Sequence, residues 1–168
     1  SPDLAVAAAR RYAPAGLLNI GGDIRAWGDK DWVVGIADPR DPAENARPVT
    51  TVALREAAIT TSGGYARFYT IAGKRYSHLI DPRTHWAAPY GGSASVIAKD
   101  AVTANALSTA SAILGVKSAE QLAASTDATG ALVIEPGGAT AATGLLKDSG
   151  KPRAYFAADA VAAPAWPK

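Results

Sequence analysis

Between residues 17 and 98, short apolar runs alternate with turn residues, a spacing that restricts the chain to folds built on a sheet of short strands. Each run has four to six residues, most of them β-branched, aromatic or aliphatic, and glycine, proline or aspartate separates most neighbouring runs. The runs are Leu17–Ile20, Ile24–Trp27, Trp32–Ile36, Val49–Leu54, Ala58–Thr61, Phe68–Ile71, Tyr76–Ile80 and Ala94–Ala98. A Gly73-Lys74 turn predicts that the runs at 68–71 and 76–80 form a β-hairpin.

Two segments have helical rather than strand periodicity. Residues Asp3–Tyr12 predict a short helix that ends before Pro14, and Ala101–Leu114 predict a long one with Asp100 or Thr103 as its cap. One face of the long helix is expected to pack on the sheet, the face with Ala106, Leu107, Ala110, Ile113 and Leu114. A further helix at 119–124 and a strand at 131–135 follow. The fold class expected is α+β, with a largely antiparallel sheet and one long packed helix.

The length of 168 residues favours one main domain, predicted at residues 1–135, followed by a weakly patterned tail at 136–168 with a short strand near residues 154–156. Alanine is unusually abundant, since 39 alanines stand beside 30 valines, isoleucines and leucines. Large aliphatic side chains are therefore scarce for a core of this size.

Charge and cysteine content exclude several classes of function. The formal net charge is only +2, and acidic and basic residues alternate along the chain, so a broad nucleic-acid or anionic-membrane surface is not expected. The absence of cysteine excludes disulfides, thiol nucleophiles and Fe–S sites. No apolar run approaches the roughly 20 residues that a membrane-spanning helix requires.

Two glycine-containing strand ends are candidate nucleotide contacts. Gly21 and Gly22 follow a strand, where their backbone N–H groups could approach a phosphate or a ring. A tight hairpin turn explains this pair equally well. At the second strand end, Ser62, Gly63 and Tyr65 form a turn that could bind an anion, although most such turns bind none.

The segment Ser77–Thr84 contains a histidine, His78, three residues before the carboxylate of Asp81. Histidine titrates near neutral pH and suits proton transfer, whereas a lone histidine can equally be structural. In an extended strand these two side chains would lie on opposite faces and need not touch.

Three oxygen-bearing side chains share one face of the predicted long helix: Asn105, Ser108 and Thr109 are spaced at i, i+3 and i+4. Mg²⁺ prefers oxygen ligands, so these positions are a candidate metal site. The alternative is a polar helix face toward solvent, because none of the three is charged.

Taken in order, these segments resemble the FAD:protein FMN transferase family, also called the ApbE or thiamine biosynthesis lipoprotein family. The resemblance covers about Leu4–Glu135. It is carried by Asn19–Gly22 with Gly28, Asp38–Arg40, Thr61–Tyr65 with Phe68, Gly73–Thr84, and Ser95-Val96 with Thr103–Thr109 and Leu114-Gly115.

The resemblance implies an activity that neither composition nor spacing could supply. Members of the family cleave the pyrophosphate of FAD, attach FMN to a Thr or Ser hydroxyl of an acceptor protein and release AMP, with Mg²⁺ as cofactor. His78 matches the family's base, and the helix positions 105, 108 and 109 match its metal ligands. Leu79 matches a flavin-nucleotide contact, and FAD contacts are also expected at Gly21, Gly22, Ser62, Gly63, Tyr65 and Asp81.

The resemblance also carries expectations about location and completeness. It implies a periplasmic or extracytoplasmic bacterial protein and an ApbE-like, T-fold-related architecture that is incomplete at its N-terminus, because family members are roughly twice this length. Two partners are then expected: the N-terminal half of the same protein, and the acceptor protein that receives the flavin.

The sequence departs from the family at two places: Asn105 replaces the usual aspartate, and His85-Trp86 follow Thr84 where glycine is usual. A non-catalytic flavin-nucleotide binding module, or a structural fragment of a longer protein, are therefore the alternatives.

Overall fold

The computed structural model describes residues 1–41, 43, 45–117, 121 and 128–147. The helices are α1 (Pro2–Ala9) and α2 (Ala101–Leu114). The strands are β1 (Gly16–Ile20), β2 (Asp23–Trp27), β3 (Trp32–Ile36), β4 (Thr50–Leu54), β5 (Ala58–Gly63), β6 (Phe68–Ile71), β7 (Lys74–Ser77), β8 (Ile80–Asp81), β9 (Trp86–Ala87), β10 (Ser93–Ala98), β11 (Ala128–Ile134) and β12 (Thr140–Gly144).

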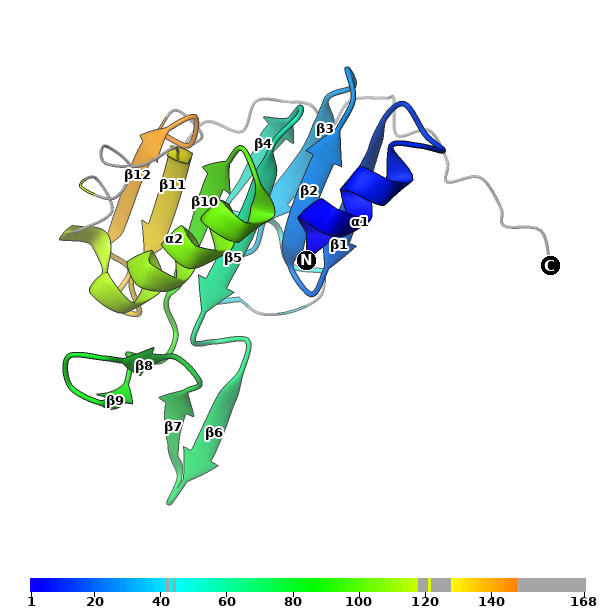
Figure 1. Cartoon of the computed structure of the whole chain (residues 1–168). Helices are drawn as coiled ribbons and strands as arrows, with labels where there is room; N and C mark the ends of the chain where they lie inside the picture. Colours follow the sequence, from blue (N-terminus) through cyan, green and yellow to red (C-terminus); the bar gives the residue numbers. More distant parts are fainter. Residues whose placement is uncertain (42, 44, 118–120, 122–127, 148–168) are drawn as a thin grey trace.

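A six-stranded sheet with the order β1-β2-β5-β10-β11-β12 forms the centre of the molecule, and all its strand pairs are antiparallel. Helix α2 lies across one face of this sheet (Figure 1). The predicted α+β class, with an antiparallel sheet and one long packed helix, is confirmed. Among the described residues, neither α1 nor α2 has the length and hydropathy of a membrane-spanning helix.

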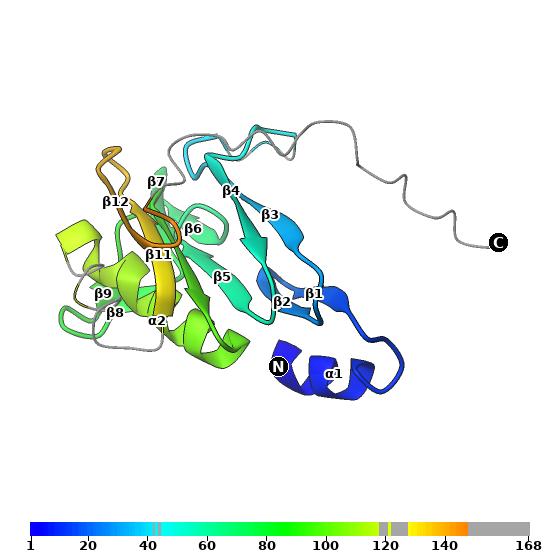
Figure 2. The same cartoon turned by 90° about the horizontal axis from the view of Figure 1, so that it is seen from above.

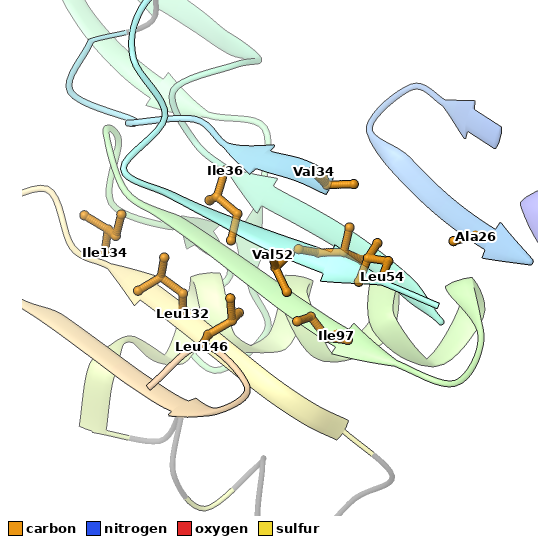
Figure 3. Packing of buried hydrophobic residues seen from close by; sticks show 10 residues of the cluster. Ala26, Val34, Ile36, Val52, Leu54, Ile97, Leu132, Ile134 and Leu146 are labelled. Atoms are coloured by element: carbon orange, nitrogen blue, oxygen red, sulfur yellow. The ribbon is translucent and has the colours of Figure 1, made fainter. Parts of the chain in front are cut away.

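Different elements cover the two faces of the sheet. Seen from above, α1 and α2 lie on one side, and the β3–β4 hairpin lies on the other (Figure 2). Strand alternation directs Ile59, Ile97 and Leu132 toward the hairpin, where they join the main hydrophobic cluster. Figure 3 shows Ile97 and Leu132 in this cluster with Ile36 and Leu54. The larger aliphatic side chains are therefore concentrated on the face away from α2.

The face of α2 that packs on the sheet differs from the predicted one. Its buried residues are Ala101, Ala104, Ser108 and Ser111, whereas Ala106 and Leu114 are exposed. The sheet presents Ala58 and Ala98 at this place, and small side chains on both surfaces allow the helix and sheet to approach closely. The apolar periodicity of 101–114 predicted the helix but not the face that it buries.

The predicted second strand of the 68–80 hairpin is interrupted at His78. Strand β7 ends at Ser77, and β8 begins at Ile80 and pairs with β9. The backbone N–H of His78 still donates to the carbonyl of Arg67, but the N–H of Leu79 donates to the hydroxyl of Ser77. The chain therefore turns at His78, at the base of the β6–β7 hairpin that extends beyond the end of β5 (Figure 1).

The structure differs from the sequence prediction at both ends of the described chain. Helix α1 ends at Ala9, before the predicted Tyr12, because the next turn tightens to i→i+3 bonds ahead of Pro14. Within the predicted tail, β12 pairs with β11, and Leu146 is completely buried in the main cluster. The predicted helix at 119–124, apart from residue 121, and the strand near 154–156 lie outside the described residues.

Candidate functional site

Three hydroxyl groups meet where the end of β5 faces α2. The Ser62 Oγ lies 2.8 Å from the Ser108 Oγ and 3.0 Å from the Thr109 Oγ1. Strand alternation produces this meeting, because Ala58, Thr60 and Ser62 of β5 all point to the α2 face. Ser108 is completely buried, Ser62 and Thr109 are half-buried, and the structure thus joins two site residues predicted on the helix to one predicted on a strand.

The direction of these hydrogen bonds follows from the proton count. The Ser108 hydroxyl donates its single proton to the backbone carbonyl of Asn105, at 3.0 Å. Ser62 must therefore donate to Ser108, and Thr109 must donate to Ser62. The chain of donors begins at Thr109, whose oxygen keeps its lone pairs for another partner.

Asn105, one helical turn before Thr109, contacts the carboxylate of Asp23, which is not among the predicted site residues. Its side-chain Nδ2 donates to the Asp23 Oδ1 at 3.0 Å and to the Oδ2 at 3.3 Å. Asp23 begins β2 and is paired with Thr60 of β5, so it lies on the same face of the sheet as Ser62. Strand alternation predicts that Asp23 and Arg25 share one face of β2. No local pattern in the sequence indicates that this face meets α2.

Gly21 and Gly22 form the tight turn that leads into Asp23. Both have positive φ angles, +65° and +100°, and the N–H of Gly22 donates to the side chain of Asn19 at 3.0 Å. The hairpin-turn interpretation of this pair is therefore correct for the backbone. The turn is exposed, and no atom lies within 4 Å of the position that a Cβ would occupy on either glycine, so a ligand could approach there.

The other glycine-containing strand end is closely packed. A Cβ on Gly63 would lie 2.6 Å from the ring of Tyr65, and one on Gly64 would lie 2.9 Å from the hydroxyl of Ser77. Only glycine fits between these groups. Burial raises the pKa of the Tyr65 hydroxyl, which is half-buried beside the strand end.

His78 follows Ser77 and is therefore close to Gly64. Its Nδ1 lies 3.0 Å from the backbone carbonyl of Arg67, and the side chain is exposed. A carbonyl oxygen can only accept, so Nδ1 carries the proton and Nε2 keeps a lone pair when the ring is neutral. This is the tautomer that a general base requires.

Asp81 does not contact His78, in agreement with the sequence prediction. Its carboxylate accepts from the Arg83 guanidinium, at 2.6 Å to Oδ2, and from the Arg83 backbone N–H at 2.9 Å. These bonds lower the pKa of Asp81 to about 2, so the carboxylate stays ionised and braces the β8–β9 loop. Leu79, between these two predicted residues, is half-buried.

The side chains beside α2 that could hold a metal ion offer oxygen atoms, and one of them, Asp23, is a carboxylate. No group of three or more His, Cys, Asp or Glu residues that could hold a metal ion exists in the described part of the chain. Mg²⁺ does not require such a group when a substrate supplies phosphate oxygens, since one or two carboxylates then suffice. The residues at this place thus fit a hard cation that is shared with a phosphate-containing ligand.

Comparison with known proteins identifies relatives over most of the chain. A model of the ApbE family matches residues 3–134. A protein named FAD:protein FMN transferase from Treponema pallidum is 37% identical over 112 residues, which cover 59% of this chain and 30% of that protein. A protein of the same name from Rhodobacter capsulatus is 35% identical over 133 residues, covering 76% of this chain and 24% of that protein.

Solved structures give the same result. The crystal structure of the ApbE protein from Thermotoga maritima matches with a TM-score of 0.71 and 33% identity, over 83% of this chain and 46% of that one. The apo form of the flavinyl transferase ApbE from Pseudomonas stutzeri matches with a TM-score of 0.65 and 27% identity, over 84% and 45%. This chain thus spans less than a third of the two curated relatives and just under half of the two solved chains.

Proposed function

This chain belongs to the ApbE family, and we propose that the intact protein that carries it is an FAD:protein FMN transferase. The observation that carries the proposal is the family match over residues 3–134, together with relatives of that name at 35–37% identity. The reaction breaks the pyrophosphate P–O bond of FAD and forms a P–O bond between the FMN phosphorus and a Thr or Ser oxygen of an acceptor protein. AMP leaves, and the hydroxyl proton must be removed.

In this proposal His78 accepts that proton. An exposed imidazole with a free Nε2 lone pair can reach a hydroxyl on another protein, and its Nδ1 bond to the Arg67 carbonyl fixes the ring orientation. The Nδ1 contact supports this role, because it leaves Nε2 as the ring atom that can accept a proton.

The flavin nucleotide is proposed to contact the two glycine-containing strand ends and the segment after His78. The open turn at Gly21 and Gly22 leaves space for it, and Ser62, Gly63 and Tyr65 offer a hydroxyl, a close backbone and a half-buried ring. In the segment after His78, the contacts are Leu79 and Asp81.

Mg²⁺ is proposed as cofactor, held near Asn105, Ser108 and Thr109. When bound, the cation supplies positive charge that neutralises the pyrophosphate oxygens. Ser108 is buried and donates to a backbone carbonyl, so its contribution there is to orient Ser62. Family membership also supports a periplasmic or extracytoplasmic location, which stays a prediction.

A non-catalytic flavin-nucleotide binding module is the second candidate. The observation that favours it is Asn105, a neutral residue where the family usually has an acid. The two candidates differ in one product, because a binding module takes up FAD without releasing AMP.

The test uses the intact protein, FAD, Mg²⁺ and a Thr-containing acceptor, with AMP measured by chromatography. His78→Asn removes the base but keeps an N–H that can donate to Arg67, and we expect it to lower the rate of AMP release at least about 100-fold. His85→Asn is the matched control, because His85 is exposed with φ +56°, a conformation that asparagine tolerates, and it should keep the wild-type rate. A wild-type rate in His78→Asn would remove His78 from the reaction, and FAD uptake without AMP would favour the binding module.

A further inference from the structure

The contact between Asn105 and Asp23 brings a carboxylate to the proposed cation site. A divalent cation bound only by neutral oxygens competes poorly with its own hydration shell, so at least one carboxylate is usual. Position 105 supplies an amide. The carboxylate of Asp23 lies 3.0 Å from that amide, although it is 82 residues away in the sequence.

Asp23 has no cationic partner in the described structure. The ion pairs among residues 1–41, 45–117 and 128–147 all involve other acids. The nearest candidate by strand position is Arg25, which lies on the same face of β2. Its guanidinium is engaged by Asp3 at 3.5 Å and by Glu56 at 4.0 Å. A half-buried carboxylate thus faces α2 with its charge unpaired by protein.

The hydrogen bonds leave acceptor atoms unused at this place. Asp23 can only accept, so the Nδ2 of Asn105 faces it and the Oδ1 of Asn105 remains available. The Thr109 oxygen, having donated its proton to Ser62, also keeps lone pairs. Asp23, Asn105 and Thr109 therefore each offer an oxygen, and one of the three carries a full charge.

An unpaired hydroxyl lies at the same helix–sheet contact. Thr60, the residue paired with Asp23 across β2 and β5, is 1% exposed, and its Oγ1 has no hydrogen-bond partner in the described part of the chain. Buried hydroxyls are normally satisfied. The described residues thus leave the Asp23 carboxylate without a cationic partner and the Thr60 hydroxyl without a hydrogen-bond partner.

We propose that Asp23 supplies the anionic ligand of a divalent-cation site formed with Asn105 and Thr109. The charge that the family usually carries on the helix is, in this chain, carried by the adjacent strand β2. The inference rests on the proposed function only for the identity of the nucleotide that shares the cation, since cation binding can be measured without turnover.

The experiment titrates the intact protein with Mn²⁺, read as loss of the free-ion electron paramagnetic resonance signal, with and without FAD. Asp23→Asn should weaken Mn²⁺ binding at least about tenfold. The double variant Asp23→Asn/Asn105→Asp returns one carboxylate to the same place and should recover binding to within about threefold of wild type. Asp29→Asn removes an exposed carboxylate from the next loop and should leave binding unchanged.

Thermal unfolding of each variant shows whether it is folded. Wild-type binding in Asp23→Asn, a double variant that folds but fails to recover binding, or no Mn²⁺ binding by the wild type would each overturn the inference. Failure of the proposed function looks different, because Mn²⁺ binding would then depend on Asp23 while FAD and acceptor yield no AMP.

Discussion

Ser108 and Ser111 lie one turn apart on α2, and each is at most 1% exposed. Their hydroxyl groups differ in hydrogen bonding. Ser108 links Ser62 to the Asn105 carbonyl, whereas the Ser111 Oγ has no partner in the described structure. We expect Ser108→Ala to lower the free energy of unfolding by about 1–2 kcal/mol, because it removes the buried oxygen that accepts the Ser62 proton.

Ser111→Ala is the control for that substitution. It removes a buried hydroxyl that gains nothing from the protein, so the free energy of unfolding should stay unchanged or rise. Urea unfolding measures both variants, and equal losses would contradict a stabilising role for the Ser108 hydrogen bonds.

The contact between Glu56 and Arg10 makes the stability of the fold depend on pH. Its carboxylate accepts from Arg10 at 2.5 Å and from the backbone N–H of Gly28, which lowers its pKa from 4.5 to about 2. Because the folded-state pKa is depressed, this contribution to stability is present above about pH 4.5 and is lost as the pH falls toward 2. Hydrogen bonds from Arg83 lower the pKa of Asp81 to about 2, so Asp81 contributes to stability with the same pH dependence.

Arg10→Gln should therefore reduce the difference in urea midpoint between pH 6 and pH 3. Arg11→Gln, a neighbouring exposed arginine, should leave that difference unchanged. The assignment to Glu56 is wrong when both variants keep the full pH dependence.

Local spacing predicted part of the candidate site. The i, i+3, i+4 spacing identified Asn105, Ser108 and Thr109, and the resemblance to the family identified His78. Asp23 could not be selected, because its contact with Asn105 depends on which face of β2 meets α2. That choice is made by packing over 82 residues of separation, for which the sequence contains no local signal.

At the element scale, the N-terminus of α2 is held from both sides. Asp100 caps it by accepting from the N–H of Thr103 at 2.8 Å, as one of the two predicted caps. The Asp3 carboxylate, from the first turn of α1, accepts from the N–H groups of Ala101 at 2.9 Å and Val102 at 3.1 Å. Residues nearly 100 positions apart thus fix the helix that carries the hydroxyl groups.

We expect Asp3→Ala to lower the free energy of unfolding by about 1 kcal/mol, because two helix N–H groups lose their acceptor and the helix dipole loses a nearby anion. Thermal unfolding measures this loss, with Asp29→Ala as a variant that removes an exposed carboxylate elsewhere. Equal stability of Asp3→Ala and wild type would show that α1 does not support α2.

Most strands were predicted within one or two residues, because their short β-branched runs are bounded by turn residues. The pattern failed where the backbone changes partner within a run, as at His78, and where small residues are buried. Strand β12 and the buried face of α2 consist largely of Ala, Thr, Ser and Gly. Such residues give no hydrophobic periodicity, although they pack as closely as larger ones.

At the scale of the whole molecule, the alanine content and the scarcity of large aliphatics have a structural explanation. The contact between α2 and the sheet is built from alanines at positions 58, 98, 101 and 104. The larger side chains are needed mainly on the opposite face, beneath the β3–β4 hairpin. This division brings the α2 backbone close to β5, so that short hydroxyl side chains can meet across the contact.

Mass spectrometry of the acceptor protein shows whether the intact protein transfers FMN from FAD to a hydroxyl. After incubation with the intact protein, FAD and Mg²⁺, we expect one covalently attached FMN on a Thr or Ser and an equal amount of AMP. An acceptor that stays unmodified, while the protein binds FAD saturably under the same conditions, would show that the protein is not an FMN transferase.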